Sequence, residues 1–296
     1  MNLKCLLEEC LMAVSRANII VPALCASLML LCMASDAAAW GGLGHRTVAA
    51  IAMRLIPQKA AKMDAILKQL EKDNNFIDAA SYPDEFIRDH DPAGKFSSWH
   101  FADLRDDKKP FVCGECLFNE LQDNLAIIHM GKDDKADAVA IAWVIHLVGD
   151  LHQPLHMTGR LRGGNDFHVT YRGKAACKNF QGGEARVELH SAWDDCLVEE
   201  LADGRGPEQL ATDLLGGITS YRGRSELSPA GSEPWLAWGD QSHVLANSVA
   251  FDSLKDGADL SDGYIEGSGK ALDVVQHQLL TAGIRLAYLL DQNFNQ

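Results

Sequence analysis

Two pairs of histidine and aspartate constrain the fold of this chain more than any other feature of its sequence. His146 precedes Asp150 by four residues, and His190 precedes Asp194 by the same spacing. Side chains four residues apart lie on one face of an α-helix, so each pair offers an imidazole and a carboxylate from one helical turn. This combination suits zinc. With His156 between the two pairs, the sequence predicts a metal site where helices meet.

Most of the chain after residue 39 has apolar residues at helical spacing. The stretch 166–171 alternates apolar and polar residues and is followed by Arg172-Gly173, which predicts one small β-hairpin. We expect a single mainly α domain (all-α in class) over residues 40–296, with metal ligands from several helices. The expected helices cover residues 46–55, 57–70, 117–130, 137–151, 188–201, 207–219, 234–254 and 267–292.

The first 39 residues are typical of a secretory leader. Residues 19–33 are almost wholly apolar, and residues 37–39 are alanines that suit a cleavage point. The apolar run is short for a membrane span, which needs ~20 residues. We expect cleavage after Ala39, export to the periplasm or the medium without a membrane anchor, and a mature chain that begins at Trp40.

The mature chain is strongly acidic. The whole sequence has a net charge of −14, of which the leader contributes −1. A nonspecific binder of duplex DNA needs a basic surface, so that class is excluded. If the chain handles nucleic acid, it does so at a local site where bound cations reverse the field.

Four cysteines follow the leader, an even number that favours disulfides in an exported protein. We expect the pairs Cys113–Cys116 and Cys177–Cys196, although four cysteines permit three pairings. A zinc site built from all four cysteines is the alternative, but the His/Asp set offers a better site. The sequence has no Asn-x-Ser/Thr acceptor, which together with the leader favours a bacterial source.

Further candidate ligands precede the two pairs. Trp40 stands five residues before His45, with glycines between them that let the chain fold back. The free α-amine of Trp40, with a pKa near ~8, could then lose its proton to the ion that His45 binds. Asp84 and His100 add a carboxylate and an imidazole. Five histidines, three aspartates and one N-terminus are too many for one zinc ion and suit three.

These motifs resemble those of a known family, the exported trinuclear zinc nucleases of the S1/P1 type, which include mung bean nuclease. The resemblance covers essentially all of the mature chain and implies a single multi-helical domain of the phospholipase C and P1 nuclease type. It is carried by the Trp-to-His start at 40–45, Trp-His-Phe at 99–101, the histidine-rich stretch 146–156, Gly-Gly-Asn at 163–165, the segment 190–194 and the helix around 282–287.

The resemblance implies how the ligands are divided among three zinc ions, with Asp150 shared by two of them. Pro154 breaks the helix after Asp150, so the chain can turn His156 toward a different ion. His152 has no place in this scheme, and we expect it to support its neighbours by a hydrogen bond. The implied sets are Asp84, His100, His146 and Asp150 for one buried ion; Trp40 (amine and carbonyl), His45 and Asp150 for a second; and His156, His190 and Asp194 for a third, more open ion.

The resemblance also implies a reaction, hydrolysis of phosphodiester bonds in single-stranded DNA and RNA to 5′-phosphate products. A hydroxide held between two zinc ions, which lower the pKa of bound water to ~7, would attack phosphorus in line. The third ion would stabilise the departing 3′ oxygen, and 3′-mononucleotides would also be substrates. Asp84 would orient the attacking water. Arg88 would brace the phosphate, although it lies four residues after Asp84 where the family has three.

A base pocket is implied as well, formed by Phe101, Asp103 and Asn165. Stacking of a base on one aromatic ring contributes ~1–3 kcal/mol and requires an unstacked base, which favours single strands. We expect the enzyme to act as a monomer.

Two other functions fit part of this pattern. Zinc-dependent phospholipases C carry a similar three-zinc scaffold, but they use glutamate where this chain has Asp194. The residues around Phe101 also fit a base pocket better than a lipid site. A non-catalytic periplasmic zinc-binding protein would lack Asp84 or an open coordination position. The sequence shows neither loss, so the nuclease interpretation is preferred.

Overall fold

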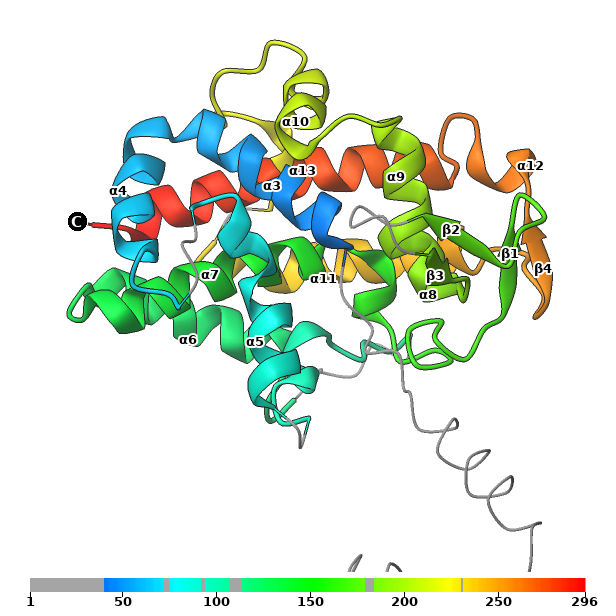
Figure 1. Ribbon diagram of the computed structural model, residues 1–296, viewed down its shortest axis with the longest axis horizontal. Coiled ribbons are helices and arrows are strands. Elements are labelled where there is room, and N and C mark those ends of the chain that lie inside the picture. The colour runs from blue at the N-terminus through cyan, green and yellow to red at the C-terminus, as the bar shows by residue number, and fades with distance from the viewer. Residues whose placement is uncertain are drawn as a thin grey trace, which may run out of the picture. The chain divides into compact units, whose positions relative to one another are not determined.

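The structure is a computed structural model that describes residues 40–71, 75–91, 94–106, 113–178, 184–229 and 231–295, without the side chains of residues 87–89, 178 and 184–186. The expected leader lies outside these residues. The described part is mainly helical, as the sequence predicts (Figure 1). Among its helices, none is long and apolar enough to cross a membrane.

Long helices form the body of the domain, and shorter ones connect them. The long helices are α3 (Gly42–Leu55), α6 (Leu117–Met130), α7 (Asp134–Leu151), α11 (Pro234–Leu245) and α13 (Ala271–Asn293). The shorter helices are α4 (Pro57–Leu67), α5 (Tyr82–His90), α8 (Leu189–Ser191), α9 (Leu197–Ala202), α10 (Pro207–Leu215) and α12 (Asp262–Ile265).

Two of the expected helices are interrupted by π-helical turns. Residues 192–196 separate α8 from α9, and residues 246–250 continue α11. Such turns are common at functional sites, and the first of them contains Asp194. Helix α5 was not predicted, because its nine residues are fewer than the ~11–18 over which apolar periodicity indicates a helix.

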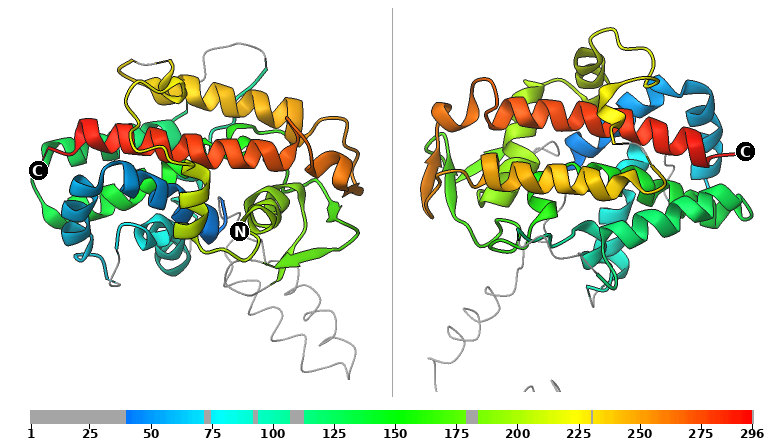
Figure 2. Two further views of the ribbon diagram at one scale, coloured as in Figure 1. Left: turned by 90° about the horizontal axis from the view of Figure 1, so that it is seen from above. Right: turned by 180° about the vertical axis from the view of Figure 1, so that it is seen from behind.

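Helix α13 passes close to both α3 and α11 (Figure 2). A Cβ on Gly283 of α13 would lie 2.3 Å from Ile51 Cγ2 in α3, so only glycine permits this crossing. On its other side, the Nη2 of Arg285 donates to Gln241 Oε1 of α11 at 2.6 Å. The close crossing fixes the start of α3, which carries His45.

Helix α7 is the central support of the site. Its N-cap, Asp133, accepts hydrogen bonds from the backbone N–H groups of Lys135 and Ala136, and nearly all of its residues after Ala136 are buried. The helix ends at Leu151, and a 3₁₀ turn (Pro154–Met157) follows. The proline thus redirects the chain toward His156, as predicted.

The small hairpin exists but lies one strand later than predicted. Residues Arg172 and Gly173 do form a tight turn, with φ angles of 49° and 72°. However, β1 (Val169–Tyr171) pairs in parallel with the distant β4 (Ala258–Leu260). The hairpin is instead formed by β2 (Ala176–Lys178) and β3 (Glu184–Arg186). Local alternation could not reveal a partner so far away in the sequence.

Candidate metal centre

The two His/Asp pairs lie on helical turns, as the sequence predicts. On α7, His146 Nε2 is 3.4 Å from Asp150 Oδ2, and both side chains are fully buried. In the second pair, His190 Nε2 is 3.2 Å from Asp194 Oδ2. Asp194 lies in the π-helical turn after α8. Each pair is the nucleus of a larger cluster.

The first described residues of the chain reach the α7 pair. Trp40 is fully buried, and the His45 ring stacks on the His146 ring with centroids 3.9 Å apart. His45 Nε2 is 3.3 Å from Asp150 Oδ1. The opposite oxygen of the same carboxylate, Oδ2, is 3.1 Å from His100 Nδ1. Asp150 therefore faces two groups of nitrogen ligands with its two oxygens.

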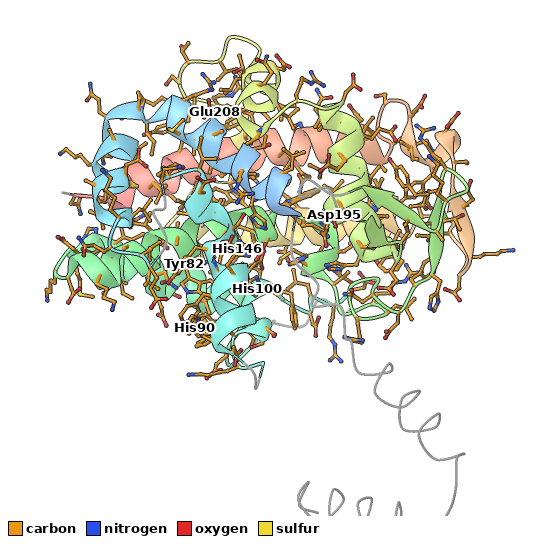
Figure 3. The ribbon with its side chains drawn as sticks, in the orientation of Figure 1. Tyr82, His90, His100, His146, Asp195 and Glu208 are labelled. Carbon is orange, nitrogen blue, oxygen red and sulfur yellow. A yellow bond between two sulfur atoms is a disulfide. The ribbon has the colours of Figure 1, made fainter. Side chains whose placement is uncertain are left out.

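Asp84 approaches from α5 on the Oδ2 side. Its Oδ1 lies 3.5 Å from His146 Nε2 and 3.9 Å from His100 Nδ1. Figure 3 labels His100 and His146 where α5 passes in front of α7. Asp84 keeps 27% of its side chain exposed, whereas Asp150 is fully buried. We call His45, Asp84, His100, His146 and Asp150 the paired cluster.

A separate cluster joins His156 to the second pair. His156 Nε2 is 3.1 Å from His190 Nε2, and the second oxygen of Asp194 accepts a hydrogen bond from Gln153 Nε2 at 2.6 Å. All of these side chains are buried. We call His156, His190 and Asp194 the third cluster.

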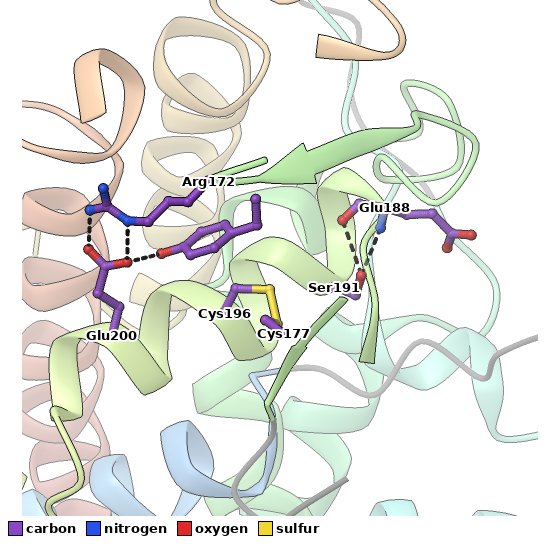
Figure 4. Close-up of a disulfide and its surroundings, with 7 residues drawn as sticks. Arg172, Cys177, Glu188, Ser191, Cys196 and Glu200 are labelled. Atoms are coloured by element: carbon purple, nitrogen blue, oxygen red, sulfur yellow. Dashed lines mark hydrogen bonds and ion pairs between the residues drawn. A yellow bond between two sulfur atoms is a disulfide. The ribbon is translucent and has the colours of Figure 1, made fainter. Parts of the chain in front are cut away.

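The segment that carries His190 and Asp194 is fastened by contacts beyond the ligands themselves (Figure 4). Glu188 and Ser191 close a capping box around His190. Two residues after Asp194, Cys196 forms a disulfide with Cys177 of β2. Further along, Arg172 contacts Glu200 of α9 through two nitrogens.

Hydrogen bonds fix the tautomers of three histidines and leave their metal-binding nitrogens bare. The Nδ1 atoms of His146, His156 and His190 each lie 2.7 Å from a backbone carbonyl oxygen. A carbonyl only accepts, so each Nδ1 carries the proton and each Nε2 presents a lone pair. The two lone pairs of His156 and His190 therefore face each other at 3.1 Å, an arrangement that calls for a cation between them.

The paired cluster also has buried ligand atoms that lack a hydrogen-bond partner, and these fit a metal ion. His45 Nε2 and Asp150 Oδ1 are buried and make no hydrogen bond in the described structure. Four-coordinate zinc with ligands at ~2.0–2.1 Å has ligand-to-ligand distances of roughly 3.3 Å. The N-to-O distances of 3.1–3.5 Å among His100, His146 and Asp150, and between Asp84 and His146, match this value. The donor atoms and their spacing thus fit a bound metal ion such as zinc.

Burial keeps the imidazoles neutral, the form that binds metals. It lowers the pKa of His45 and of His156 well below the usual value, and it lowers the pKa of His190 to about 4. Burial also raises the pKa values of Asp150 and Asp194. A bound cation would lower the pKa of both carboxylates again, since an adjacent positive charge favours their ionised form.

The expected base pocket borders the third cluster. The backbone N–H of Ala102 donates to the His156 carbonyl at 2.9 Å, which places Phe101 and Asp103 at this edge. Phe101 is 39% exposed, unusual for a phenylalanine beside a buried site. A Cβ on Gly159 would lie 3.1 Å from Asp103 Cγ. Asn165, in the same loop as Gly159, donates to the Arg162 carbonyl.

The structure also bears on the cysteines and on His152, but it does not test the role expected of Arg88. The cysteines form the two expected disulfides, Cys113–Cys116 and Cys177–Cys196, which excludes the four-cysteine zinc site. His152 points away from the clusters, with Nδ1 2.7 Å from the Val148 carbonyl and Nε2 accepting from Arg285. The Arg88 side chain lies outside the described part of the structure.

Sequence reasoning missed several supports of the site. A Cβ on Gly149 would lie 2.6 Å from His45 Nδ1, so the glycine makes room for the stacked imidazole. A glycine inside an apolar helix was the available signal. Asp195 was also missed. It is partly buried, and this desolvation raises its pKa to about 6. Nothing in the sequence separates it from other aspartates.

Known proteins resemble this chain over nearly the whole of its described part. A sequence model of the S1/P1 nuclease family matches residues 40–295. Nuclease S1 of Aspergillus oryzae is 28% identical over 279 residues, covering 85% of this chain and 91% of the relative. Nuclease P1 of Penicillium citrinum is 25% identical over 277 residues, covering 86% and 97%. Endonuclease 4 of Arabidopsis thaliana is 26% identical over 301 residues, covering 90% and 93%.

Proposed function

The chain belongs to the S1/P1 nuclease family, and from this premise we propose that it is an exported, zinc-dependent endonuclease that converts single-stranded DNA and RNA to 5′-phosphate products. Membership makes it a hydrolase of phosphodiester bonds and decides against both the phospholipase C and the non-catalytic interpretations. The observation that carries the proposal is the meeting of three His/Asp groups whose buried nitrogen and oxygen atoms face one another.

We assign two zinc ions to the paired cluster and one to the third cluster. Asp150 would serve both ions of the pair, because its two oxygens face different histidines. The remaining ligands of the pair would be Asp84, His100 and His146 on one side, and His45 with the amine and carbonyl of Trp40 on the other. His156, His190 and Asp194 would hold the third ion.

When bound, the zinc ions would lower the pKa of a water molecule and offset charge on the phosphate and on the departing 3′ oxygen. Within the chain, Asp84 is the carboxylate of the paired cluster that solvent reaches. Its exposed part is suited to accept a hydrogen bond from the attacking water and to direct it at phosphorus. Arg88, four residues further along α5, is assigned to the phosphate.

Phe101 would bind a nucleobase by stacking on its exposed ring, with Asp103 accepting a hydrogen bond from the base edge and Asn165 completing the rim. A stacked base must leave its duplex partner, which accounts for a preference for single strands. The same pocket and third ion would accept 3′-mononucleotides, whose phosphate is then removed. The two disulfides suit an oxidising compartment and so support export to the periplasm or the medium.

A substrate panel tests this function. The mature protein, with Trp40 verified as its first residue, is incubated with single-stranded DNA, RNA, duplex DNA, a 3′-mononucleotide and phosphatidylcholine. We expect cleavage of both single strands to 5′-mononucleotides, slower cleavage of duplex, and loss of activity after EDTA treatment with recovery on adding zinc. Release of phosphocholine without nucleolysis, or full activity in EDTA, would contradict the proposal.

A further inference from the structure

A carboxylate outside the proposed ligand set lies against the first peptide of the mature chain. Asp195 follows Asp194 in the π-helical turn. A Cβ on Gly41 would lie 2.1 Å from Asp195 Oδ1, so this oxygen packs directly on the Gly41 Cα. Gly41 also donates its backbone N–H to the Asp194 carbonyl at 2.9 Å. Figure 3 labels Asp195 beside the start of α3.

The Asp195 carboxylate accepts no hydrogen bond from the residues that the structure describes, although its side chain is only partly exposed. Glu199, one helical turn later, acts on it with a charge of the same sign. A carboxylate that is shielded from most of the solvent and has no donor is costly. Its position therefore points to a donor that appears only when the N-terminus is free.

The α-amine of Trp40 would be that donor. An amine that gives its lone pair to a metal ion keeps two N–H bonds, and Trp40 is fully buried, so these bonds need acceptors. Nitrogen ligands of metals commonly donate their remaining N–H to a carboxylate, which fixes the direction of the lone pair. Asp195 is the carboxylate that lies against the neighbouring residue.

We propose that Asp195 is a positioning residue that accepts a hydrogen bond from the α-amine of Trp40 and directs the amine lone pair toward the paired cluster. The inference rests on the proposed function, in which Trp40 begins the mature chain and its amine is a ligand. It also explains why residue 41 is glycine, because any side chain there would displace the carboxylate.

A double-mutant cycle on zinc affinity tests this role. Zinc bound per chain is measured in buffers of fixed free zinc for four proteins: the mature chain, the chain with one serine added before Trp40, and the Asp195→Ala variant of each. In the mature chain we expect Asp195→Ala to weaken zinc binding at the paired cluster by about 10–100-fold. In the extended chain the Trp40 nitrogen is part of a peptide bond and is no longer a free amine. The same substitution should therefore have no further effect there.

The outcomes separate the inference from the function on which it rests. If the added serine leaves zinc binding unchanged, the amine is not a ligand, and both fail. If the serine weakens binding but Asp195→Ala does not, only the role of Asp195 is wrong. Equal losses in both backgrounds would mean that Asp195 acts on the fold and would likewise overturn the inference.

Two further variants sharpen the test. Asp195→Asn retains an acceptor oxygen of similar size, so it should restore much of the affinity lost in Asp195→Ala. Glu199→Gln is the matched control, because Glu199 is the neighbouring acid but does not contact Gly41. It should bind zinc like the unmodified mature chain, and thermal unfolding of each protein would show that the fold is retained.

Discussion

The paired and third clusters use the same residue types but are held in place by different means. The paired cluster is assembled by helices of the core, with His45 stacked on His146 at the contact of α3 with α7. The third cluster lies between a 3₁₀ turn and a π-helical turn that a disulfide and a capping box fasten. Its histidines are held by two backbone carbonyls, that of His100 at the end of a 3₁₀ turn and that of Gly163 in a loop.

This difference teaches where each cluster is vulnerable. The paired cluster shares one carboxylate, so its two proposed ions should be lost together, and it should resist any change that leaves the core intact. The third cluster has its own ligands, so it should empty alone. The disulfide and the capping box belong to neither α3 nor α7, so their removal should not reach the paired cluster.

The largest effect is expected from Asp150→Asn. An asparagine amide offers one neutral oxygen in place of the two charged oxygens of the carboxylate, so it cannot bridge two cations. Zinc content should fall from three ions to one, with the remaining ion at the third cluster. Nuclease activity should fall by roughly 10³-fold or more, because metal ions contribute several kcal/mol of charge stabilisation. Asp134→Asn, at the exposed start of α7, should change neither. Loss of a single ion would contradict the shared role of Asp150.

Asp194→Asn should empty the third cluster and leave the paired cluster filled. It removes a ligand of the third cluster and leaves the Gln153 amide without its carboxylate acceptor. We expect two ions to remain and activity to fall by roughly 10²-fold, the scale of a lost electrostatic stabiliser. Elemental analysis and kinetics measure both quantities. Loss of all three ions would show that the clusters are not independent.

Removal of the Cys177–Cys196 disulfide should have a smaller effect on the same cluster. Replacement of both cysteines by serine opens a link over 19 residues, which lowers the free energy of unfolding by about 3 kcal/mol. Zinc at the third cluster should then be released faster to a chelator, while the pair is unaffected. The Cys113→Ser and Cys116→Ser double variant is the control. Equal release from both clusters would refute the assignment of this support.

Phe101→Ala should have the smallest effect, on substrate binding alone. Loss of a stacking platform costs ~1–3 kcal/mol, so KM for single-stranded DNA should rise roughly 10-fold while three zinc ions remain bound. Met130→Ala, which removes an apolar side chain that is 55% exposed elsewhere, should leave KM unchanged. An unaltered KM in Phe101→Ala would place the base pocket elsewhere.

The sequence predicted the metal clusters better than it predicted their supports. The spacing of His146 and Asp150 sufficed to place them on one helical face, because helix geometry is local. The carbonyls that fix the histidine tautomers, such as those of Ala80 and Gly163, could not be foreseen. Every residue has a carbonyl, and only the fold decides which of them meets an imidazole.

The same reason accounts for the errors in the fold. Periodicity predicted α6 with its correct bounds and most of α7. It did not predict that β1 would pair with β4, because that contact joins residues 89 positions apart, such as Thr170 and Asp259. Nor did it reveal that Arg285, in an apolar helix, reaches His152 behind the metal site.

Anomalous diffraction at the zinc absorption edge, from crystals of the mature protein, tests the central claim most directly. We expect three peaks: two on opposite sides of the Asp150 carboxylate, with the Trp40 amine beside one of them, and a third among His156, His190 and Asp194. A single peak at the paired cluster, or an Asp150 that contacts only one ion, would contradict the account.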